Sequence, residues 1–206
     1  MFAVALGEGF LATTRREAAE ILVVEGWIAG AGVAAAASEF RGGNYDYVVA
    51  TGGMTSSSWG QRRWQYAQAA EHTLLKSGLT QDRILLAPAR EVETQRTFES
   101  ALAVSRTLSA MGLKPRAVNV FTLGPHARRT ALVYRKVLGP TIKVGVIAWQ
   151  RPELQSGPWW QSTERAENLI TQTAGYLFEL ILNSGRRGRD EGEGELSASN
   201  EGGDGG

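Results

Sequence analysis

The sequence predicts an α/β protein with a three-layer α/β/α, Rossmann-like fold and a mainly parallel five-stranded sheet. Two observations lead to this prediction. Five short runs rich in apolar and β-branched residues are typical of strands that are buried on both faces. These runs alternate with five longer segments that favour helix, so each connection is too long for a hairpin. Right-handed crossovers would then place helices on both faces of a parallel sheet.

The strands are placed by the apolar runs and by the residues that stop them. Gly52 and Gly53 end the second run, and Pro88 stops the third because proline cannot donate a ladder hydrogen bond. The predicted strands are residues 21–24, 46–51, 83–87, 117–123 and 143–149.

The helices are placed by composition and by glycine or proline at their ends. The first is rich in alanine, and the fourth has Pro125 in its first turn. The predicted helices are residues 31–40, 61–77, 93–111, 125–138 and 163–182. The last helix has an apolar face formed by Ala166, Leu169, Ile170, Thr173, Leu177, Leu180 and Ile181.

The two ends of the chain differ from the domain that we assign to residues 20–184. Residues 1–19 form a weakly patterned lead-in, in which residues 17–20 are either a helical turn or an irregular approach to the first strand. Residues 185–206 are rich in glycine and charge, and we expect a disordered tail because they cannot bury enough apolar surface to offset their ordering entropy.

Composition excludes several classes of function. The net charge of +1 provides no overall field that would attract nucleic acid or an anionic membrane. The absence of cysteine excludes disulfides, thiolate catalysis and Cys-ligated zinc, and two histidines are too few for a His-rich metal site. No stretch reaches the roughly 20 apolar residues of a membrane span, so the chain as it stands is expected to be soluble and cytoplasmic.

The second strand is followed by a loop suited to an anion. Gly52 and Gly53 let a ligand approach the main chain, Thr55 and Ser56 add small donors, and the next helix points its first N–H groups toward them. The loop matches neither the dinucleotide-binding nor the P-loop motif. The alternative is a tight turn between strand and helix that binds no ligand.

His126 is the sharpest candidate for catalysis. It lies three residues before Arg129 in the first turn of a helix, so both side chains can face one anionic group. Neighbouring positive charge should favour a neutral imidazole that can act as a base. The alternative is a histidine that packs locally beside solvated arginines, and His72 is expected to be structural.

Glu25 and Trp27 follow the first strand. A carboxylate at that edge could accept a ribose hydroxyl, hold a cation or act as an acid or base, and the alternative is a pair with a nearby arginine. Trp27 belongs to a group of tryptophans after strand ends that could stack on a flat ligand, or that could simply cover the top of the sheet.

Four motifs resemble, in order, the bacterial YdcF-like domain family, whose SanA- and ElyC-type members are envelope proteins. They are Val-Val-Glu-Gly-Trp (23–27), Val-Val-Ala-Thr-Gly-Gly (48–53), Arg-Thr-Phe-Glu-Ser-Ala (96–101) and Gly-Pro-His-Ala-Arg-Arg (124–129). The resemblance covers about residues 20–182, and Glu-Gly-Trp is similar to one branch of the family.

The resemblance implies a pocket lined by Gly52, Gly53, Thr97, Glu99, His126 and Arg129. It also implies a small anionic or nucleotide-like ligand, with S-adenosylmethionine as the candidate cofactor, and a role in cell-envelope maintenance. No established reaction accompanies it: the protein would be an enzyme, such as a transferase or hydrolase, or else a non-catalytic sensor or scaffold.

The chain departs from the family in two respects. Tyr66 replaces a common acidic residue and Arg96 a common asparagine, which disfavours a metal or a pair of carboxylates as the mechanism, and we predict no metal site. Many members also carry an N-terminal membrane helix that would end about where this chain begins. If that anchor is missing from the sequence, the expected location is the envelope.

Overall fold

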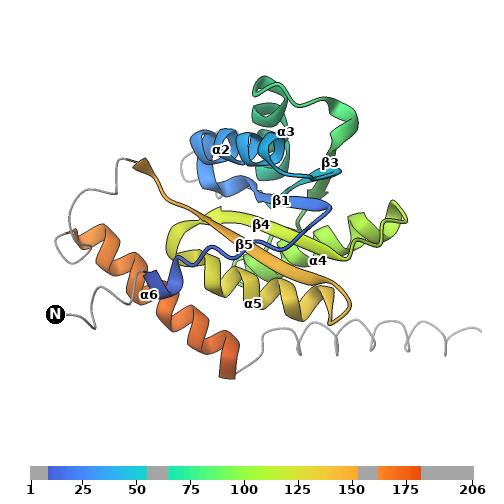
Figure 1. Ribbon diagram of the computed structural model, residues 1–206. Helices are drawn as coiled ribbons and strands as arrows, with labels where there is room; N and C mark the ends of the chain where they lie inside the picture. Colours follow the sequence, from blue (N-terminus) through green and yellow to red (C-terminus); the bar gives the residue numbers. More distant parts are fainter. Residues whose placement is uncertain (1–8, 55–64, 153–161, 182–206) are drawn as a thin grey trace, which may run out of the picture.

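The computed structural model describes residues 9–54, 65–152 and 162–181. Its centre is a five-stranded, all-parallel sheet with the strand order β3-β2-β1-β4-β5 (Figure 1). The strands are β1 (Ile21–Glu25), β2 (Tyr47–Gly52), β3 (Ile84–Pro88), β4 (Ala117–Leu123) and β5 (Lys143–Trp149). The predicted α/β fold class and parallel sheet are confirmed.

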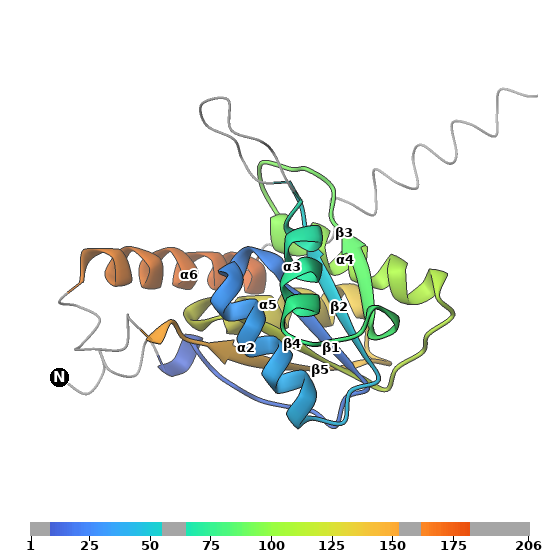
Figure 2. The ribbon, with the colours of Figure 1, turned by 90° about the horizontal axis from the view of Figure 1, so that it is seen from above.

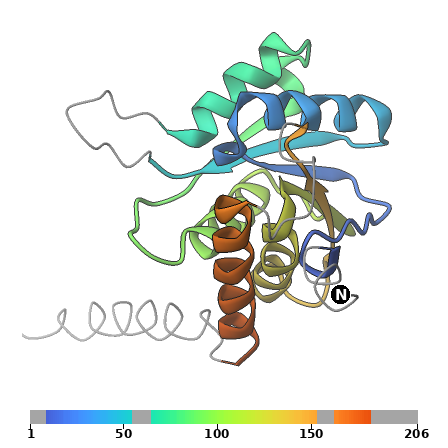
Figure 3. The same cartoon turned by 90° about the vertical axis from the view of Figure 1, so that its left-hand side faces the viewer.

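Helices cover both faces of the sheet, as Figures 1 and 3 show from two sides. One face carries α2 (Ala29–Gly42) and α3 (Tyr66–Lys76), and the other carries α4 (Arg96–Ala110) and α5 (Ala127–Leu138). The sixth helix, α6 (Thr163–Ile181), lies beside α5 (Figure 3). Short 3-10 turns, η1 (Gly26–Ile28), η2 (Gln81–Arg83) and η3 (Gly124–His126), complete the described elements.

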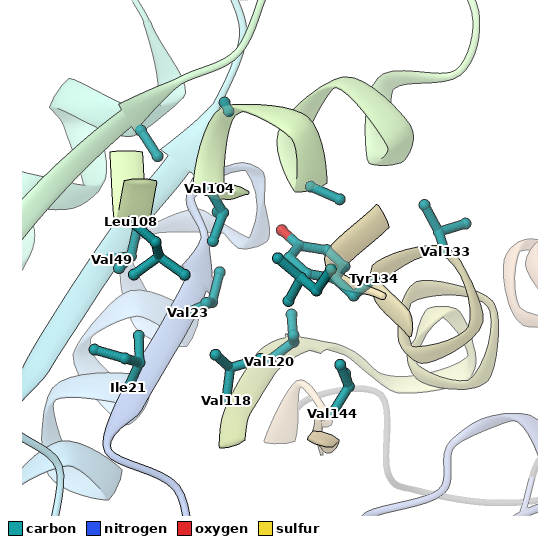
Figure 4. Packing of buried hydrophobic residues seen from close by; sticks show 14 of the residues in the cluster. Ile21, Val23, Val49, Val104, Leu108, Val118, Val120, Val133, Tyr134 and Val144 are labelled. Atoms are coloured by element: carbon teal, nitrogen blue, oxygen red, sulfur yellow. The ribbon is translucent and has the colours of Figure 1, made fainter. Parts of the chain in front are cut away.

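Alternation along the strands divides the core into two layers. Val23 points toward α4 and α5, whereas its neighbours Leu22 and Val24 point toward α2 and α3. Figure 4 shows the first layer, where strand valines surround the fully buried ring of Tyr134 from α5. Burial on both faces explains why the strands are apolar runs without alternating polar residues.

Three helices begin later than predicted. Helix α5 starts at Ala127 rather than residue 125, because Gly124–His126 form the 3-10 turn η3. Helix α3 starts at Tyr66 rather than near residue 61, and Thr55 and Ser56 lie outside the described residues. Helix α4 starts at Arg96 rather than residue 93, because Gln95 adopts a left-handed conformation with φ of 58° that a helix cannot continue through. The short polar stretch before Gln95 therefore forms a loop, which Figure 2 shows above the carboxyl end of β3.

The lead-in is part of the domain rather than a separate approach to it. Residues 17–20 have no regular secondary structure and end in a bend at Glu20, so the helical turn considered for them is wrong. Arg15 and Val146 exchange backbone hydrogen bonds of 2.8 and 2.7 Å, which adds an antiparallel bridge to the outer edge of β5. The Asn119 side chain bonds both the N–H and the carbonyl of Glu17, and Leu11 is buried.

Helix α6 packs with a different face from the one that its apolar residues suggest. Ile170 and Ile181 are 67% and 76% exposed, whereas Leu169 and the polar Glu179 are buried. Lys136 of α5 donates hydrogen bonds to the Glu179 carbonyl and carboxylate. The polar side of α6 faces the domain because it finds specific partners on α5 and η3 there.

Candidate functional site

A cavity of about 470 Å³ opens at the carboxyl ends of the strands. The chain builds β1, β2 and β3 outward in one direction and then adds β4 and β5 on the other side of β1. The loops that follow β1 and β4 therefore run in opposite directions, and a crevice lies between them. This crevice is the usual ligand site of the architecture. The cavity walls come from the ends of β1 and β2, residues 89–95 after β3, and the starts of α4 and α5, together with Thr171 and Gln172 of α6.

A second hollow, of about 840 Å³, lies at the opposite, amino-terminal edge of the sheet. Its charged side chains already pair with each other: Arg16 with Glu39 at 2.8 Å, and Arg116 with Glu20 at 2.8 Å. The smaller cavity is the better candidate, because it lies at the carboxyl edge of the sheet and brings His126, Arg96 and Arg129 to one place.

The glycine turn shapes one wall of the cavity. Gly52 has φ of 142°, and a side chain there would place its Cβ 2.7 Å from Cβ of Tyr66. The Gly53 carbonyl accepts a hydrogen bond of 2.9 Å from the Tyr66 N–H, and a Cβ at Gly53 would lie 3.1 Å from the Arg90 carbonyl oxygen. Both glycines line the cavity and are required by close backbone approach, so the turn has a structural role whether or not it binds a ligand.

The imidazole of His126 is held from both sides. Its Nδ1 lies 2.6 Å from Oε1 of Gln172, and its Nε2 lies 3.2 Å from Oγ1 of Thr97. An amide oxygen can only accept, so Nδ1 carries the proton and Nε2 accepts from the Thr97 hydroxyl. Nε2 of Gln172 donates in turn to Oδ1 of Asn168 at 3.3 Å, which is consistent with this orientation of the amide.

The same surroundings keep His126 neutral. The pKa of His126 is lowered to about 4, first by desolvation and then by the charges of Arg129 and Arg96, against the hydrogen bond to Gln172, which raises it. Trp27 covers the ring edge-on, with centroids 5.1 Å apart. The expected neutral imidazole is present, but burial is a larger cause than neighbouring positive charge.

Arg129 and Arg128 lie on different sides of α5. Arg129 lines the cavity, and its guanidinium lies so close to α6 that a Cβ at Gly175 would be 3.0 Å from Nη1. Its Nε is buried without a hydrogen-bond partner among the described residues. Arg128 stacks instead on the ring of Phe10 at 3.7 Å and donates a hydrogen bond of 2.6 Å to the Phe10 carbonyl.

Glu25 lies beneath the site rather than at its surface. It is 1% exposed and is not among the residues that line the cavity, so its carboxylate does not reach the cavity surface. Its Oε2 accepts a hydrogen bond of 2.5 Å from the Thr122 hydroxyl, and Oε1 has no partner among the described residues. The strand ends inside the core, and Trp27, which itself lines the cavity, interacts with the carboxylate.

Burial sets the protonation of Glu25 and of its neighbour Tyr134. Desolvation raises the pKa of Glu25 to about 7, against the opposing effects of Thr122, Trp27 and the charge of Arg129. The pKa of the Tyr134 phenol is raised well above its ordinary value by burial and by Glu25. Glu25 therefore changes charge near neutral pH, in the core rather than in the cavity lining to which Arg129 belongs.

The remaining site predictions have mixed outcomes. Thr97 and Trp27 line the cavity, whereas Glu99 does not, and its Oε2 is buried without a partner in the part of the chain that the structure describes. Gln172 is absent from the predicted site because a glutamine in an amphipathic helix carries no sign of function. Only the packing of α6 brings it to His126.

Within residues 9–54, 65–152 and 162–181, no group of three or more His, Asp or Glu side chains could hold a metal ion. None of the described helices is long and apolar enough to cross a membrane. Comparison with models of protein families finds no match to this chain, and no curated protein matches its sequence significantly.

Proposed function

We propose that the cavity binds a small anionic or nucleotide-like ligand, and that the protein is an enzyme with His126 as acid or base and Arg129 as anion clamp. The observation that carries this proposal is the meeting of a neutral imidazole and a guanidinium in one cavity of about 470 Å³ at the crevice between the two central strands. This is the position at which the fold ordinarily binds ligands.

The charges around the cavity favour an anion. Arg90, Arg96 and Arg129 line it, against the two carboxylates of Glu91 and Glu93. Helices α4 and α5 both begin there, and no side chain caps either of them. Their positive ends and the planar guanidinium of Arg129 suit a phosphate or carboxylate.

The aromatic walls extend the choice of ligand to nucleotide-like molecules. Trp27 and Tyr66 both line the cavity, and such rings stack on flat ligands. The resemblance to the YdcF-like family adds S-adenosylmethionine to the candidates and suggests an envelope precursor as substrate.

Binding is tested by calorimetry on the full chain with inorganic phosphate, sugar phosphates, nucleotides and S-adenosylmethionine. Arg129→Ala should weaken an anionic ligand roughly 10- to 150-fold, since a hydrogen bond to a charged group contributes about 1.5–3 kcal/mol. Arg128→Ala is the matched control and should change affinity little, because Arg128 stacks on Phe10 outside the cavity. Greater damage from Arg128→Ala would place the site on the other side of α5.

His126→Gln separates an enzyme from a sensor. Glutamine can retain neutral hydrogen bonding, so an enzyme should keep its ligand and lose turnover by roughly 10²- to 10⁴-fold. A non-catalytic sensor would bind the same ligand and show no turnover in either form. A scaffold would keep its role after both pocket substitutions and lose it when tryptophans outside the cavity lining, such as Trp149, are replaced.

A further inference from the structure

Thr97, His126 and Gln172 form a continuous hydrogen-bonded chain across three helices. Thr97 is the second residue of α4, His126 ends η3 at the start of α5, and Gln172 lies in the middle of α6. The contacts are 3.2 Å from Oγ1 of Thr97 to Nε2 of His126 and 2.6 Å from Nδ1 to Oε1 of Gln172. All three residues line the same cavity.

The direction of the hydrogen bonds gives each member a chemical role. The hydroxyl of Thr97 donates to a neutral imidazole, whose other nitrogen is fixed by an amide oxygen. An alcohol within reach of a base, with the base oriented by a third group, is the arrangement that activates a nucleophile. The Thr97 hydroxyl does not cap α4, so helix capping does not explain its position.

The charges at this chain match a phosphoryl group. Arg129 and Arg96 both line the cavity that holds His126, and the charge of each lowers the pKa of the imidazole. Thr97 lies in the first turn of α4, where the N–H groups and the helix dipole favour negative charge. Positioning and charge stabilisation are what phosphoryl transfer requires of a protein.

We propose that Thr97 is a nucleophile that takes the phosphoryl group from a phosphate monoester, with His126 as its base; this rests on the proposed function of the same cavity. As the Oγ1–P bond forms, the hydroxyl proton moves to Nε2 of His126, and the bond from phosphorus to the leaving alcohol breaks. The departing oxygen takes that proton. Water then attacks the phosphothreonine, its proton passes through His126 to Oγ1, and inorganic phosphate leaves.

Gln172 is a positioning residue in this scheme. Its amide oxygen holds the Nδ1–H tautomer and adds no charge, unlike a carboxylate at the same place. Gln172→Glu should therefore raise the pKa of His126 and move the acidic limb of the rate profile to higher pH. A merely structural role for Gln172 would leave that limb where it is.

The test uses the full chain and p-nitrophenyl phosphate at neutral pH, with acid quench, intact mass and peptide mapping. We expect a burst of nitrophenol matching the protein concentration and one phosphoryl group on Thr97. Thr97→Ser should retain labelling and Thr97→Val should abolish it, while His126→Gln should slow turnover roughly 10²- to 10⁴-fold. Thr107→Val is the matched control, since that hydroxyl lies on α4 and donates to the Leu86 carbonyl away from the cavity.

Three results would overturn the nucleophile. One is binding of inorganic phosphate without any release of nitrophenol, which would leave the proposed function standing. Another is turnover by folded Thr97→Val at the wild-type rate, which would mean that His126 acts directly on water. The third is a label on another residue. If none of the anions tested by calorimetry binds, both the proposed anion-binding function and the nucleophilic role of Thr97 are contradicted.

Discussion

Glu25 is buried and His126 is half-buried, and the shifts of their pKa values have opposite consequences for stability. The pKa of Glu25 is raised to about 7, so the folded state favours the protonated carboxyl. This group's contribution to the free energy of unfolding is fully present below about pH 4.5 and is lost as pH rises through 7. The pKa of His126 is lowered to about 4, so its contribution is present above about pH 6.5 and lost as pH falls through 4. At about 1.4 kcal/mol per pKa unit, each amounts to roughly 3 kcal/mol, and the two windows overlap.

The free energy of unfolding of the wild-type protein should therefore vary little between about pH 4.5 and 6.5. Glu25→Gln should expose the histidine contribution, so that stability rises with pH across this range. His126→Gln should do the reverse and show stability falling toward pH 7. Urea denaturation at several pH values measures the three slopes, and slopes of the same sign in both variants would contradict the assignment. The ion-paired Glu20 and Glu39 have lowered pKa values and lose their contributions only below this window.

Gly52 combines a positive φ with close approach to Tyr66 at the start of α3. Gly52→Val should cost roughly 1–3 kcal/mol of stability from its positive φ, and contact with Tyr66 should displace the cavity wall and abolish anion binding. Gly112→Val is the control, because Gly112 also has positive φ, but an added Cβ there would have no heavy atom of the described residues within 4 Å beyond its immediate neighbours. It should lose stability alone, measured by thermal unfolding beside ligand titration. Full affinity in Gly52→Val would remove this turn from the site.

Two neighbouring apolar residues of helix α6 differ in burial and therefore in their expected contribution to stability. Leu169 is 7% exposed, whereas Ile170 lies on the outer side of the helix. Leu169→Ala should lower the free energy of unfolding by about 2 kcal/mol, and Ile170→Ala by less than about 0.5 kcal/mol. Chemical denaturation of the two variants side by side gives the comparison. Similar losses in both would mean that the outer face of α6 is covered in solution.

The lead-in is an element that stabilises the whole molecule. It contributes the buried Leu11, the bridge from Arg15 to Val146 and the two bonds between Glu17 and the Asn119 side chain. Gly145 makes room for this arrangement, since a Cβ there would lie 2.0 Å from Oδ1 of Asn119. The lead-in therefore covers the β5 edge of the sheet near Val146, although its sequence has no strand-like pattern.

A chain that starts at residue 18 should be less stable than the full chain by about 2–4 kcal/mol, because it loses the buried Leu11 and both hydrogen bonds between Glu17 and the Asn119 side chain. The hydrogen bond of 2.9 Å from Asn119 to the Tyr45 hydroxyl would remain. Urea denaturation of both chains tests this, with Leu11→Ala as a milder variant that keeps the backbone bridge. An unchanged midpoint in the shortened chain would show that the domain begins at β1 and that the lead-in contributes nothing to it.

At the scale of the whole molecule, local patterns in the chain are sufficient to predict the sheet and the edge of the sheet at which the cavity lies. Strands β4 and β5 occupy the predicted residues, since apolar, β-branched runs between helices can be buried only in the middle of a layered fold. Residues that follow such strands must gather at one edge, so chain order alone groups His126, Arg129 and the two glycines. This works because strand burial and helix spacing are properties of neighbouring residues.

The packing of α6, the course of the lead-in and the groups that hold His126 depend instead on tertiary contacts. Amphipathic periodicity predicts the apolar side of α6 as its buried side, but hydrogen bonds from Lys136 and to Gln172 turn the polar side inward. Glu25 is predicted at the site, and its strand instead ends within the core, where burial shifts its pKa. Each of these features depends on partners tens of residues away, and their energies arise only when the elements meet.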